Sequence, residues 1–257
     1  MKKGDVMAPQ QEESHIPSLR ALERGLQLLD YLIRVKEARL HKIAEETSLP
    51  PSTTHRLLQA LERHGYVTGT QHGFYKLGLK GFWLTGVRES LRHVLEDLQK
   101  KTGETVNLAM LVQDEMEYVE RAVSDHALSF VVSVGQRVPL NCSALGKAVL
   151  AYQPDLLAHI SLEQRTSHSI TDLVELKAEL EVARHRGFTL DNEEYFDGVF
   201  CVAVPVFDQR GEAIGGVSIS GPTVRFSREQ AFQYAPLLKA AGERISQLLQ
   251  THEGGET

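Results

Sequence analysis

The stretch from Leu40 to Tyr66 constrains this chain more than any other, because it has the pattern of two short helices joined by a tight turn. Apolar residues recur at helical spacing from Leu40 to about Thr47, which predicts the first helix. Two prolines follow, and Ser52 directly after them is a good N-cap for a second helix that Gly65 would end. One side of this second helix is apolar, so it can pack on the first.

The other side of the second helix carries hydrogen-bonding and cationic residues: Thr53, His55, Arg56, Gln59 and Arg63. A helix-turn-helix protein needs this arrangement, since its second helix must enter the major groove of DNA and still pack on the first. Two amphipathic helices also occur in many helical domains that bind no DNA. However, two short strand patterns follow, at 66–69 and 73–77, and a hairpin in that position predicts a winged helix-turn-helix.

The charge of the chain is divided unevenly along its length. The 257 residues carry a formal net charge of -6. Residues 17–80 have a net charge of +4, whereas residues 81–257 have a net charge of -9. A basic head on an acidic body is expected if only the head touches DNA. Because +4 is modest, we expect the protein to present two heads as a dimer.

The sequence contains no signal for export, membrane insertion or cofactor chemistry. No apolar run approaches the ~20 residues of a membrane span, and the polar residues 1–17 have no signal-peptide core and are expected to be disordered. The two cysteines are too few for a disulfide framework, so we expect a cytoplasmic protein. The sequence has no histidine pair with metal-ligand spacing, no Cys-x-x-Cys motif and no phosphate-binding glycine loop, so we expect no metal, no cofactor and no catalytic residues.

The remaining periodicity predicts an α+β protein. A helix over 18–34 would close the small core with a stripe of Leu19, Leu22, Leu26, Leu29 and Ile33. A long helix over 79–102, interrupted near Gly86, would end at Gly103. Beyond it, helices are expected at 145–152, 154–159, 173–186 and, after a Ser227 cap, to about 249. Strands are expected at 105–112, 117–123, 128–134, 200–207 and 213–220.

Several short motifs occur in a fixed order over some 200 residues. They are Leu22–Gly25, Ser52–Leu58, Tyr75–Gly78, Thr102–Thr105, Gly135–Leu140, Ala144–Ala148, Glu193-Glu194 with Gly198–Cys201, and Val217–Pro222. In this combination the chain resembles the IclR family of bacterial transcription regulators. Two positions depart from that family: Ser48 stands in the turn where a glycine is usual, and Thr54 stands where an apolar residue is usual. A turn with positive φ at Ser48 is therefore expected to be less favourable.

The resemblance implies a two-domain α+β protein. Its parts would be a tail at 1–17, a winged helix-turn-helix domain at 18–80, a linker helix at 81–102 and a GAF-like effector-binding domain at 103–257. It also implies a homodimer or homotetramer that binds double-stranded operator DNA and no membrane. The expected DNA contacts are Ser52, Thr53, Thr54, His55, Arg56 and Gln59 on the second helix, and Lys76 in the wing.

The resemblance also implies a pocket for a small carboxylate effector. Carried over from the family, its residues are Ala144, Leu145, Gly146, Asp191, Cys201, Ser218 and Ser220. Ser218 and Ser220 are two apart on a strand, so their hydroxyls face one side, and Gly146 would leave backbone N–H groups reachable for an anion. Ala127 and Phe130 are expected to form an apolar wall. Simpler roles stay open: Cys201 as a core residue, Asp191 as a turn cap, Lys147 as structural, and Glu193 and Glu194 as exposed charges.

Three functions fit this pattern. The leading one is an effector-controlled transcriptional regulator, with repression favoured, and not an enzyme. The first alternative is a thiol redox enzyme that uses Cys142 and Cys201. The second alternative is a protein that binds DNA constitutively and has no effector.

Overall fold

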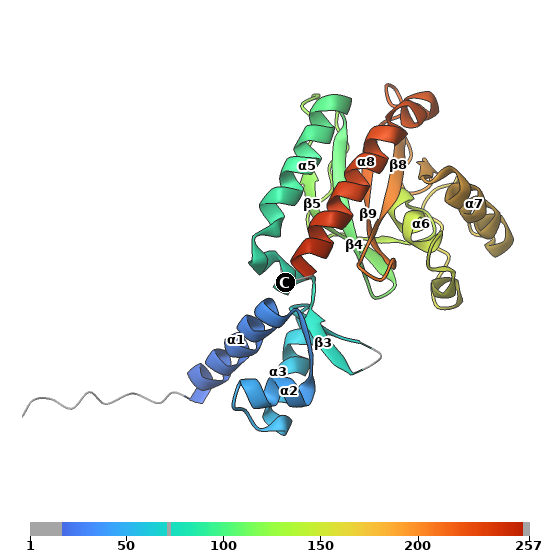
Figure 1. Cartoon of the computed structure of the whole chain (residues 1–257). Helices are drawn as coiled ribbons and strands as arrows, with labels where there is room; N and C mark the ends of the chain where they lie inside the picture. The colour runs from blue at the N-terminus through green and yellow to red at the C-terminus, as the bar shows by residue number, and fades with distance from the viewer. Residues whose placement is uncertain (1–16, 71–72, 254–257) are drawn as a thin grey trace, which may run out of the picture. The chain divides into compact units, whose positions relative to one another are not determined.

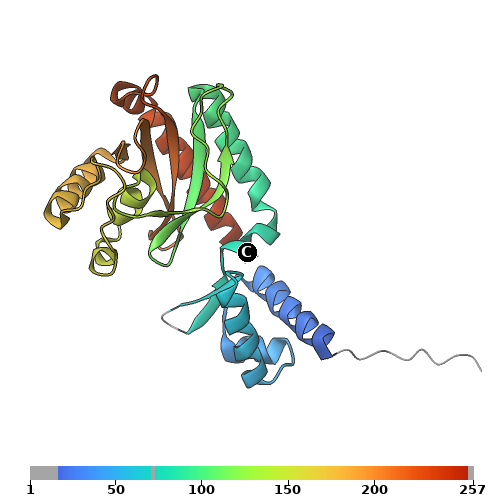
Figure 2. The same cartoon turned by 180° about the vertical axis from the view of Figure 1, so that it is seen from behind.

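A computed structural model describes residues 17–70 and 73–253 of the chain. Of the tail predicted to be disordered at 1–17, residues 1–16 lie outside the described residues, and Pro17 is instead the first residue of α1. The chain forms two compact units, Met1–Phe82 and Trp83–Thr257 (Figures 1 and 2). The first unit contains the predicted helix-turn-helix, and the second contains a helix followed by a mixed α/β domain. The predicted α+β fold class, with a winged helix-turn-helix head and a linker helix, is confirmed.

The first unit is a winged helix-turn-helix with a three-stranded antiparallel sheet. Its elements are α1 (Pro17–Val35), β1 (Glu37–Arg39), α2 (Leu40–Glu46), α3 (Pro51–Arg63), β2 (Val67–Gly69), β3 (Phe74–Leu77) and α4 (Leu79–Phe82). The hairpin of β2 and β3 was predicted, whereas β1, which pairs with β3 to give the order β1-β3-β2, was not. A three-residue strand has too little pattern to be detected in a sequence.

The predicted apolar stripe of α1 is wrong in its N-terminal half. Leu19, Leu22 and Leu26 are about half exposed, at 47%, 59% and 50%. The buried leucines of α1 begin further along, with Leu28 and Leu32, which pack in the core of the first unit beside Ile43, Leu58 and Val67. Helical periodicity gives the face of a helix but not how far its neighbours extend along it, and here they cover only the C-terminal half.

The turn of the helix-turn-helix differs from expectation at its second helix. α3 begins at Pro51 with Pro50 as its N-cap and no side-chain cap, so Ser52 is not the N-cap. The Pro50 carbonyl accepts hydrogen bonds from the Thr53 and Thr54 N–H groups instead, and the fixed φ of a proline suits the first helical position. Ser48 has the expected positive φ, 53°.

The second unit opens with the predicted interrupted helix. A 3₁₀ turn at Trp83–Thr85 leads into α5 (Val87–Thr102). Gly86 and Gly103 have φ values of 82° and 73°, so the helix is bounded at both ends by left-handed residues that glycine adopts without strain.

A six-stranded antiparallel sheet forms the centre of the second unit, in the order β6-β5-β4-β9-β8-β7. The strands are β4 (Thr105–Val112), β5 (Glu115–Ala122), β6 (Arg137–Pro139), β7 (Thr189–Asn192), β8 (Val199–Phe207) and β9 (Ala213–Pro222). α5 and α8 (Arg228–Glu253) lie side by side on one face (Figure 1). α6 (Ala144–Leu150), the 3₁₀ helix Pro154–Ala158 and α7 (Leu173–Arg186) lie on the other (Figure 2).

The strand predicted at 128–134 does not form. The segment between β5 and β6 is a loop in which Leu128, Val131 and Val134 are exposed and Val132 is buried. Its β-branched composition suits a strand, but Val132 and Phe130 pack against the core cluster that contains α6 instead of pairing with the edge of β5. The loop instead crosses the sheet face that carries α6.

Candidate functional sites

The exposed face of α3 carries most of the predicted DNA contacts. Ser52, His55, Arg56 and Gln59 are exposed, Thr53 is half-buried, and Lys76 is half-buried on β3 of the wing. Thr54 does not reach this surface. It is fully buried, and its hydroxyl donates to the Pro50 carbonyl at 3.2 Å, because its position in the helical repeat faces the core.

A groove between α1 and α3 adds cationic residues that sequence reasoning missed. Arg20 and Arg24 of α1 line it together with Arg56 and Arg63 of α3. None of these four guanidinium groups forms an ion pair with another residue in the described part of the chain. Arg20 and Arg24 are four residues apart and therefore lie on one face of α1, and this spacing could have predicted their place beside α3.

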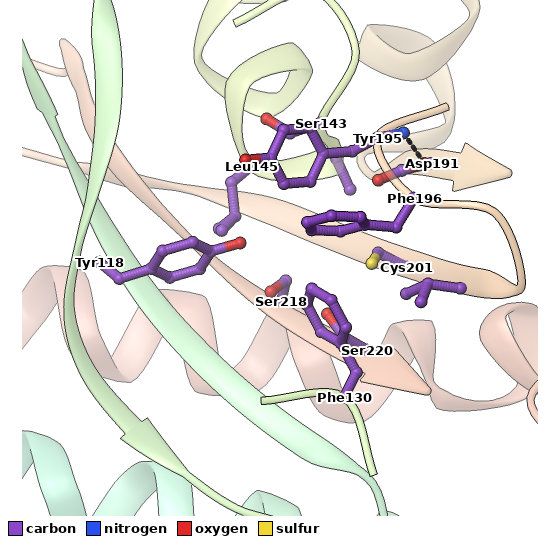
Figure 3. Close-up of a pocket in the computed structure, with 12 residues that line it drawn as sticks. Tyr118, Phe130, Ser143, Leu145, Asp191, Tyr195, Phe196, Cys201, Ser218 and Ser220 are labelled. Atoms are coloured by element: carbon purple, nitrogen blue, oxygen red, sulfur yellow. Dashed lines mark hydrogen bonds between the residues drawn. The ribbon is translucent and has the colours of Figure 1, made fainter. Parts of the chain in front are cut away.

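A small pocket lies on the sheet face that α6 covers. Its cavity volume is about 10 Å³, and it is lined by Tyr118, Phe130, Ser143, Ala144, Leu145, Asp191, Tyr195, Phe196, Val199, Cys201, Ser218 and Ser220 (Figure 3). Seven of the nine residues predicted for effector binding therefore lie together: Phe130, Ala144, Leu145, Asp191, Cys201, Ser218 and Ser220. Their sequence positions span residues 130 to 220, so only the fold brings them into contact.

Strand register explains why the sheet residues meet. Asp191 pairs with Cys201 and Cys201 pairs with Ser220, so these three side chains stand in one row on the same face. Ser218 lies two residues along β9 and faces the same way. Tyr118 of β5 points toward this row from two strands away (Figure 3).

Two predicted residues do not belong to the pocket. Ala127 is exposed and lies outside the lining, because the loop before β6 brings Phe130 to the pocket and leaves Ala127 in solvent. The Gly146 N–H donates to the Ser143 hydroxyl at 3.0 Å, so it is not free for a ligand. A Cβ at Gly146 would lie 2.4 Å from the backbone of Leu140, so glycine serves close packing there.

Aromatic side chains cover the pocket. The rings of Tyr195 and Phe196 lie 4.4 Å apart, and Phe196 lies 5.5 Å from Phe130 on the other loop. Phe130 was predicted, but Tyr195 and Phe196 were missed, as were Tyr118, Ser143 and Val199. Tyr195 and Phe196 follow Glu193 and Glu194, and nothing in that local pattern indicates that their rings turn inward.

Asp191 is the charged group of the lining, and it is buried. Its Oδ1 accepts hydrogen bonds from the backbone N–H of Glu194 at 2.8 Å and of Tyr195 at 3.3 Å, and the second of these is drawn in Figure 3. Burial and the nearby Glu194 carboxylate raise the pKa of Asp191 to about 7, although Lys147 acts in the opposite direction. Asp191 can therefore have both expected roles: Oδ1 caps the turn, and Oδ2 can face the pocket.

Glu194 is buried rather than exposed as predicted. Its Oε1 lies 2.5 Å from the Lys147 ammonium, which is also buried. Burial is the largest influence on Glu194 and raises its pKa. Lys147 therefore has the structural role expected of it, as the counter-ion of a buried carboxylate beside the pocket.

Some buried polar atoms around the pocket have no protein partner. Among the described residues these atoms include the Ser218 hydroxyl, the Asn107 Oδ1 and the Glu194 Oε2. Ser218 and Asn107 are paired across β9 and β4, so both side chains face the pocket side of the sheet. A buried hydroxyl without a partner is costly unless a ligand or water bonds to it.

Comparison with known proteins agrees with this architecture. Residues 21–70 match the IclR helix-turn-helix domain, and residues 84–247 match the bacterial transcriptional regulator IclR C-terminal domain. The chain belongs to the IclR family of bacterial transcriptional regulators.

Individual members of the IclR family are similar over most of their length. The regulator BhcR of Paracoccus denitrificans is 35% identical, in an alignment that covers 88% of this chain and 91% of that protein. The transcriptional repressor IclR of Escherichia coli is 31% identical, with 88% of each chain covered. The crystal structure of Thermotoga maritima IclR superposes with a TM-score of 0.62 at 31% identity and covers 90% of this chain and 99% of that chain.

Membership of the IclR family identifies a transcriptional regulator rather than an enzyme. The redox alternative also lacks a reactive thiol. Cys142 and Cys201 are free and buried, and burial raises the pKa of Cys142 to about 12 and that of Cys201 well above its ordinary value. A thiolate is the reactive form of cysteine, and these surroundings disfavour it.

Searches for two other kinds of site gave no candidates. Within residues 17–70 and 73–253, no three His, Cys, Asp or Glu side chains are grouped closely enough to hold a metal ion. None of the helices in the same ranges combines the length and apolar character needed to cross a bilayer.

Proposed function

We propose that this IclR-family regulator is a repressor that binds operator DNA as a homodimer or homotetramer and responds to a small carboxylate in the pocket. We assign DNA binding to residues 18–80, the linker to 81–102 and ligand binding to 103–257. The observation that carries the ligand assignment is the Ser218 hydroxyl, which is 1% exposed, lines the pocket and has no protein partner.

The DNA-binding assignment rests on α3 and its cationic neighbours. Thr53, His55, Arg56 and Gln59 would face base edges and phosphates, and Lys76 of the wing would contact phosphate. Arg20 and Arg24 would extend the contact to α1. Arginines without an ion-pair partner suit phosphate contacts. Each contact releases counterions from the DNA, which raises affinity without depending on the base sequence.

The polarity of the pocket supports a small acid. The cavity of about 10 Å³ has room for about one water molecule, so an acid would enter as the covering rings of Phe130 and Phe196 move outward. Ser218 and Ser220 offer hydroxyl donors, and the rings of Phe130 and Phe196 offer an apolar wall. A ligand with a carboxylate at one end and a short alkyl or aromatic part at the other fits both.

An effector changes DNA affinity only if it binds one arrangement of the DNA-binding units better than another. The pocket joins α6, β8, β9 and two loops, so an occupant would bias their relative positions. In the proposed repressor, the acid would favour the arrangement with the lower operator affinity.

A thermal-shift experiment tests the ligand assignment. The full chain is heated with pyruvate, propionate and benzoate, and at least one acid is expected to raise the melting temperature because it binds the folded state. The Ser218→Ala variant should lose most of this increase. Ser161→Ala, which changes an exposed serine outside the pocket, should keep it. A panel that leaves the melting temperature unchanged would contradict the assignment.

A salt titration tests the DNA assignment. A duplex is first enriched from a random pool with the full chain. Replacing both Arg20 and Arg24 by alanine should lower the slope of log K against log salt by about 1.8, since each phosphate contact contributes about 0.9. Arg184→Ala on α7 is the matched control and should leave the slope unchanged. An unchanged slope for the double variant would place the DNA elsewhere.

A further inference from the structure

The pocket poses a charge problem for any anionic ligand. Among the described residues that line it there is no lysine, arginine or histidine, and the charged member of the lining is the carboxyl group of Asp191. A buried anion is unstable without a counter-charge or a hydrogen-bond donor. A carboxylate effector would therefore enter a pocket whose own charge repels it.

The nearest cation is already engaged. Lys147 of α6 lies 2.5 Å from Glu194, and the side chains of both residues are almost fully removed from solvent. The buried group thus contains one ammonium and two carboxylates, Glu194 and Asp191. Lys147 and Glu194 neutralise each other, which leaves Asp191 as the excess negative charge.

The titratable and charged groups around Asp191 come from several elements. They are Glu194 and Tyr195 on its own loop, Lys147 of α6, Cys142 before α6, Cys201 of β8 and Tyr118 of β5. Arg165 lies over the Tyr195 ring at 5.6 Å and forms an ion pair with Glu163, so this cation is also neutralised. The two thiols and the Tyr118 phenol are held neutral because burial raises the pKa of each. Besides Glu194, then, Asp191 is the group in this set that can take up a proton near neutral pH.

We propose that the pocket binds its acid together with a proton, which resides on Asp191 and is donated in a hydrogen bond to the carboxylate of a small monocarboxylate. This inference rests on the proposed ligand-binding function. Oδ1 of Asp191 already accepts two backbone N–H groups, so the proton is placed on Oδ2. The Ser218 hydroxyl supplies a second donor to the same ligand.

This arrangement balances charge and selects among acids. Lys147 with Glu194 is neutral, protonated Asp191 is neutral, and the ligand contributes one negative charge that two donors stabilise. A second carboxylate on the ligand would add a second negative charge, and the described lining residues include no cation to balance it. Monocarboxylates are therefore expected to bind more tightly than dicarboxylates of equal length, such as propionate compared with malonate.

Affinity should also depend on pH in one direction. Because the pKa of free Asp191 lies at about 7, the competent protonated form is common at pH 6 and scarce at pH 8. The acid remains ionised throughout this range. The apparent dissociation constant should rise about tenfold from pH 6 to pH 8, in proportion to the loss of the competent form.

Titration calorimetry on the wild-type chain tests the proposal directly. Whichever of pyruvate, propionate and benzoate stabilises the protein is titrated in phosphate and in Tris, whose ionisation enthalpies differ. The difference gives the number of protons taken up. We expect about 0.9 proton per acid at pH 8 and about 0.1 at pH 6, because the group is already protonated at the lower pH.

Variants locate the proton. Asp191→Asn should remove both the proton uptake and the pH dependence, whereas Asp114→Asn, at an exposed turn, should change neither. Acid binding by the wild type without proton uptake at pH 8 would overturn the proposal and leave the ligand-binding function intact. The absence of binding by all three acids would remove both. Proton uptake that persists in Asp191→Asn would assign it to another group and also overturn the proposal.

Discussion

The ammonium of Lys147 and the carboxylate of Glu194 form a buried salt bridge, with 2.5 Å between Nζ and Oε1. Lys147 belongs to α6, and Glu194 lies in the loop after β7 that carries Tyr195 and Phe196 over the pocket. The pair therefore ties the covering loop to the helix beneath it. Thr166 and Ser169 add to this anchoring, because both hydroxyls donate to the Glu194 carbonyl, at 3.2 and 2.6 Å.

Removing the cation of this pair should destabilise the second unit strongly. Lys147→Met leaves the Glu194 carboxylate buried without its counter-ion, and the free energy of unfolding is expected to fall by about 3–5 kcal/mol. Urea denaturation measures the change. Lys100→Met, at an exposed position on α5, should stay within about 0.5 kcal/mol of wild type. Combining Lys147→Met with Glu194→Leu should recover part of the loss. A single variant as stable as the control would show that the pair contributes little.

The stability of the second unit should depend on pH through Asp191. Burial, with the added effect of Glu194, raises the pKa of this group from 3.8 to about 7. Between pH 4 and pH 7 the folded protein keeps a proton on Asp191 that the unfolded chain has lost. Proton binding by Asp191 therefore stabilises the folded state fully below pH 4, and this contribution is lost as the pH rises to 7. The slope is about 1.4 kcal/mol per pH unit. Urea denaturation of wild type and Asp191→Asn from pH 4 to 8 isolates the contribution. Parallel curves for the two proteins would contradict it.

Mutations of two nearby residues of α3 should affect DNA affinity differently. Arg56→Ala removes an exposed guanidinium and should weaken binding to the enriched duplex by about 1–3 kcal/mol. Thr54→Val replaces a buried side chain by one of nearly the same shape. The Pro50 carbonyl loses the hydroxyl donor but keeps its two backbone N–H partners. DNA affinity of Thr54→Val should therefore stay within about twofold of wild type. Fluorescence anisotropy measures both. A large loss for Thr54→Val in a folded protein would mean that Thr54 reaches the DNA.

The turn before α3 should become more stable when its strained residue is replaced by glycine. Ser48 has a φ of 53°, a conformation that costs a residue with a side chain about 1–2 kcal/mol. Glycine avoids this cost but loses about 0.5–1 kcal/mol of chain entropy on folding. Ser48→Gly should therefore stabilise the first unit by up to about 1.5 kcal/mol, and Ser48→Val should destabilise it. Thermal denaturation followed by circular dichroism compares them. The opposite order would contradict the backbone assignment.

Local patterns in the sequence predicted the elements well. The strand Thr105–Val112 and the helix Leu173–Arg186 have the predicted bounds, and Gly86 and Gly103 bound α5 as expected. These features depend on side-chain periodicity and on the positive φ of glycine, which neighbouring residues fix. The same reasoning failed at 128–134, where the residues form a loop that packs Phe130 and Val132 against the core.

The candidate pocket was predicted in part, by resemblance rather than by local pattern. Of the expected residues, Ala127 lies in solvent and Gly146 packs against Leu140. Tyr118, Tyr195 and Phe196 were missed because their orientation depends on partners distant in the sequence. Glu194 was expected to be exposed, since nothing near it in the chain indicates that Lys147, forty-seven residues earlier, would meet it.

The sequence by itself determined the family, the order of elements and the helix-turn-helix, because periodicity, turn residues and recurring motifs act over short distances along the chain. Only the tertiary structure decided how much of α1 is buried, and that Asp191 shares a pocket with Ser218 and lies beside a buried Lys147–Glu194 pair. Burial and pKa depend on what surrounds a side chain in three dimensions. Strand register and long-range packing set these surroundings, and no local pattern specifies them.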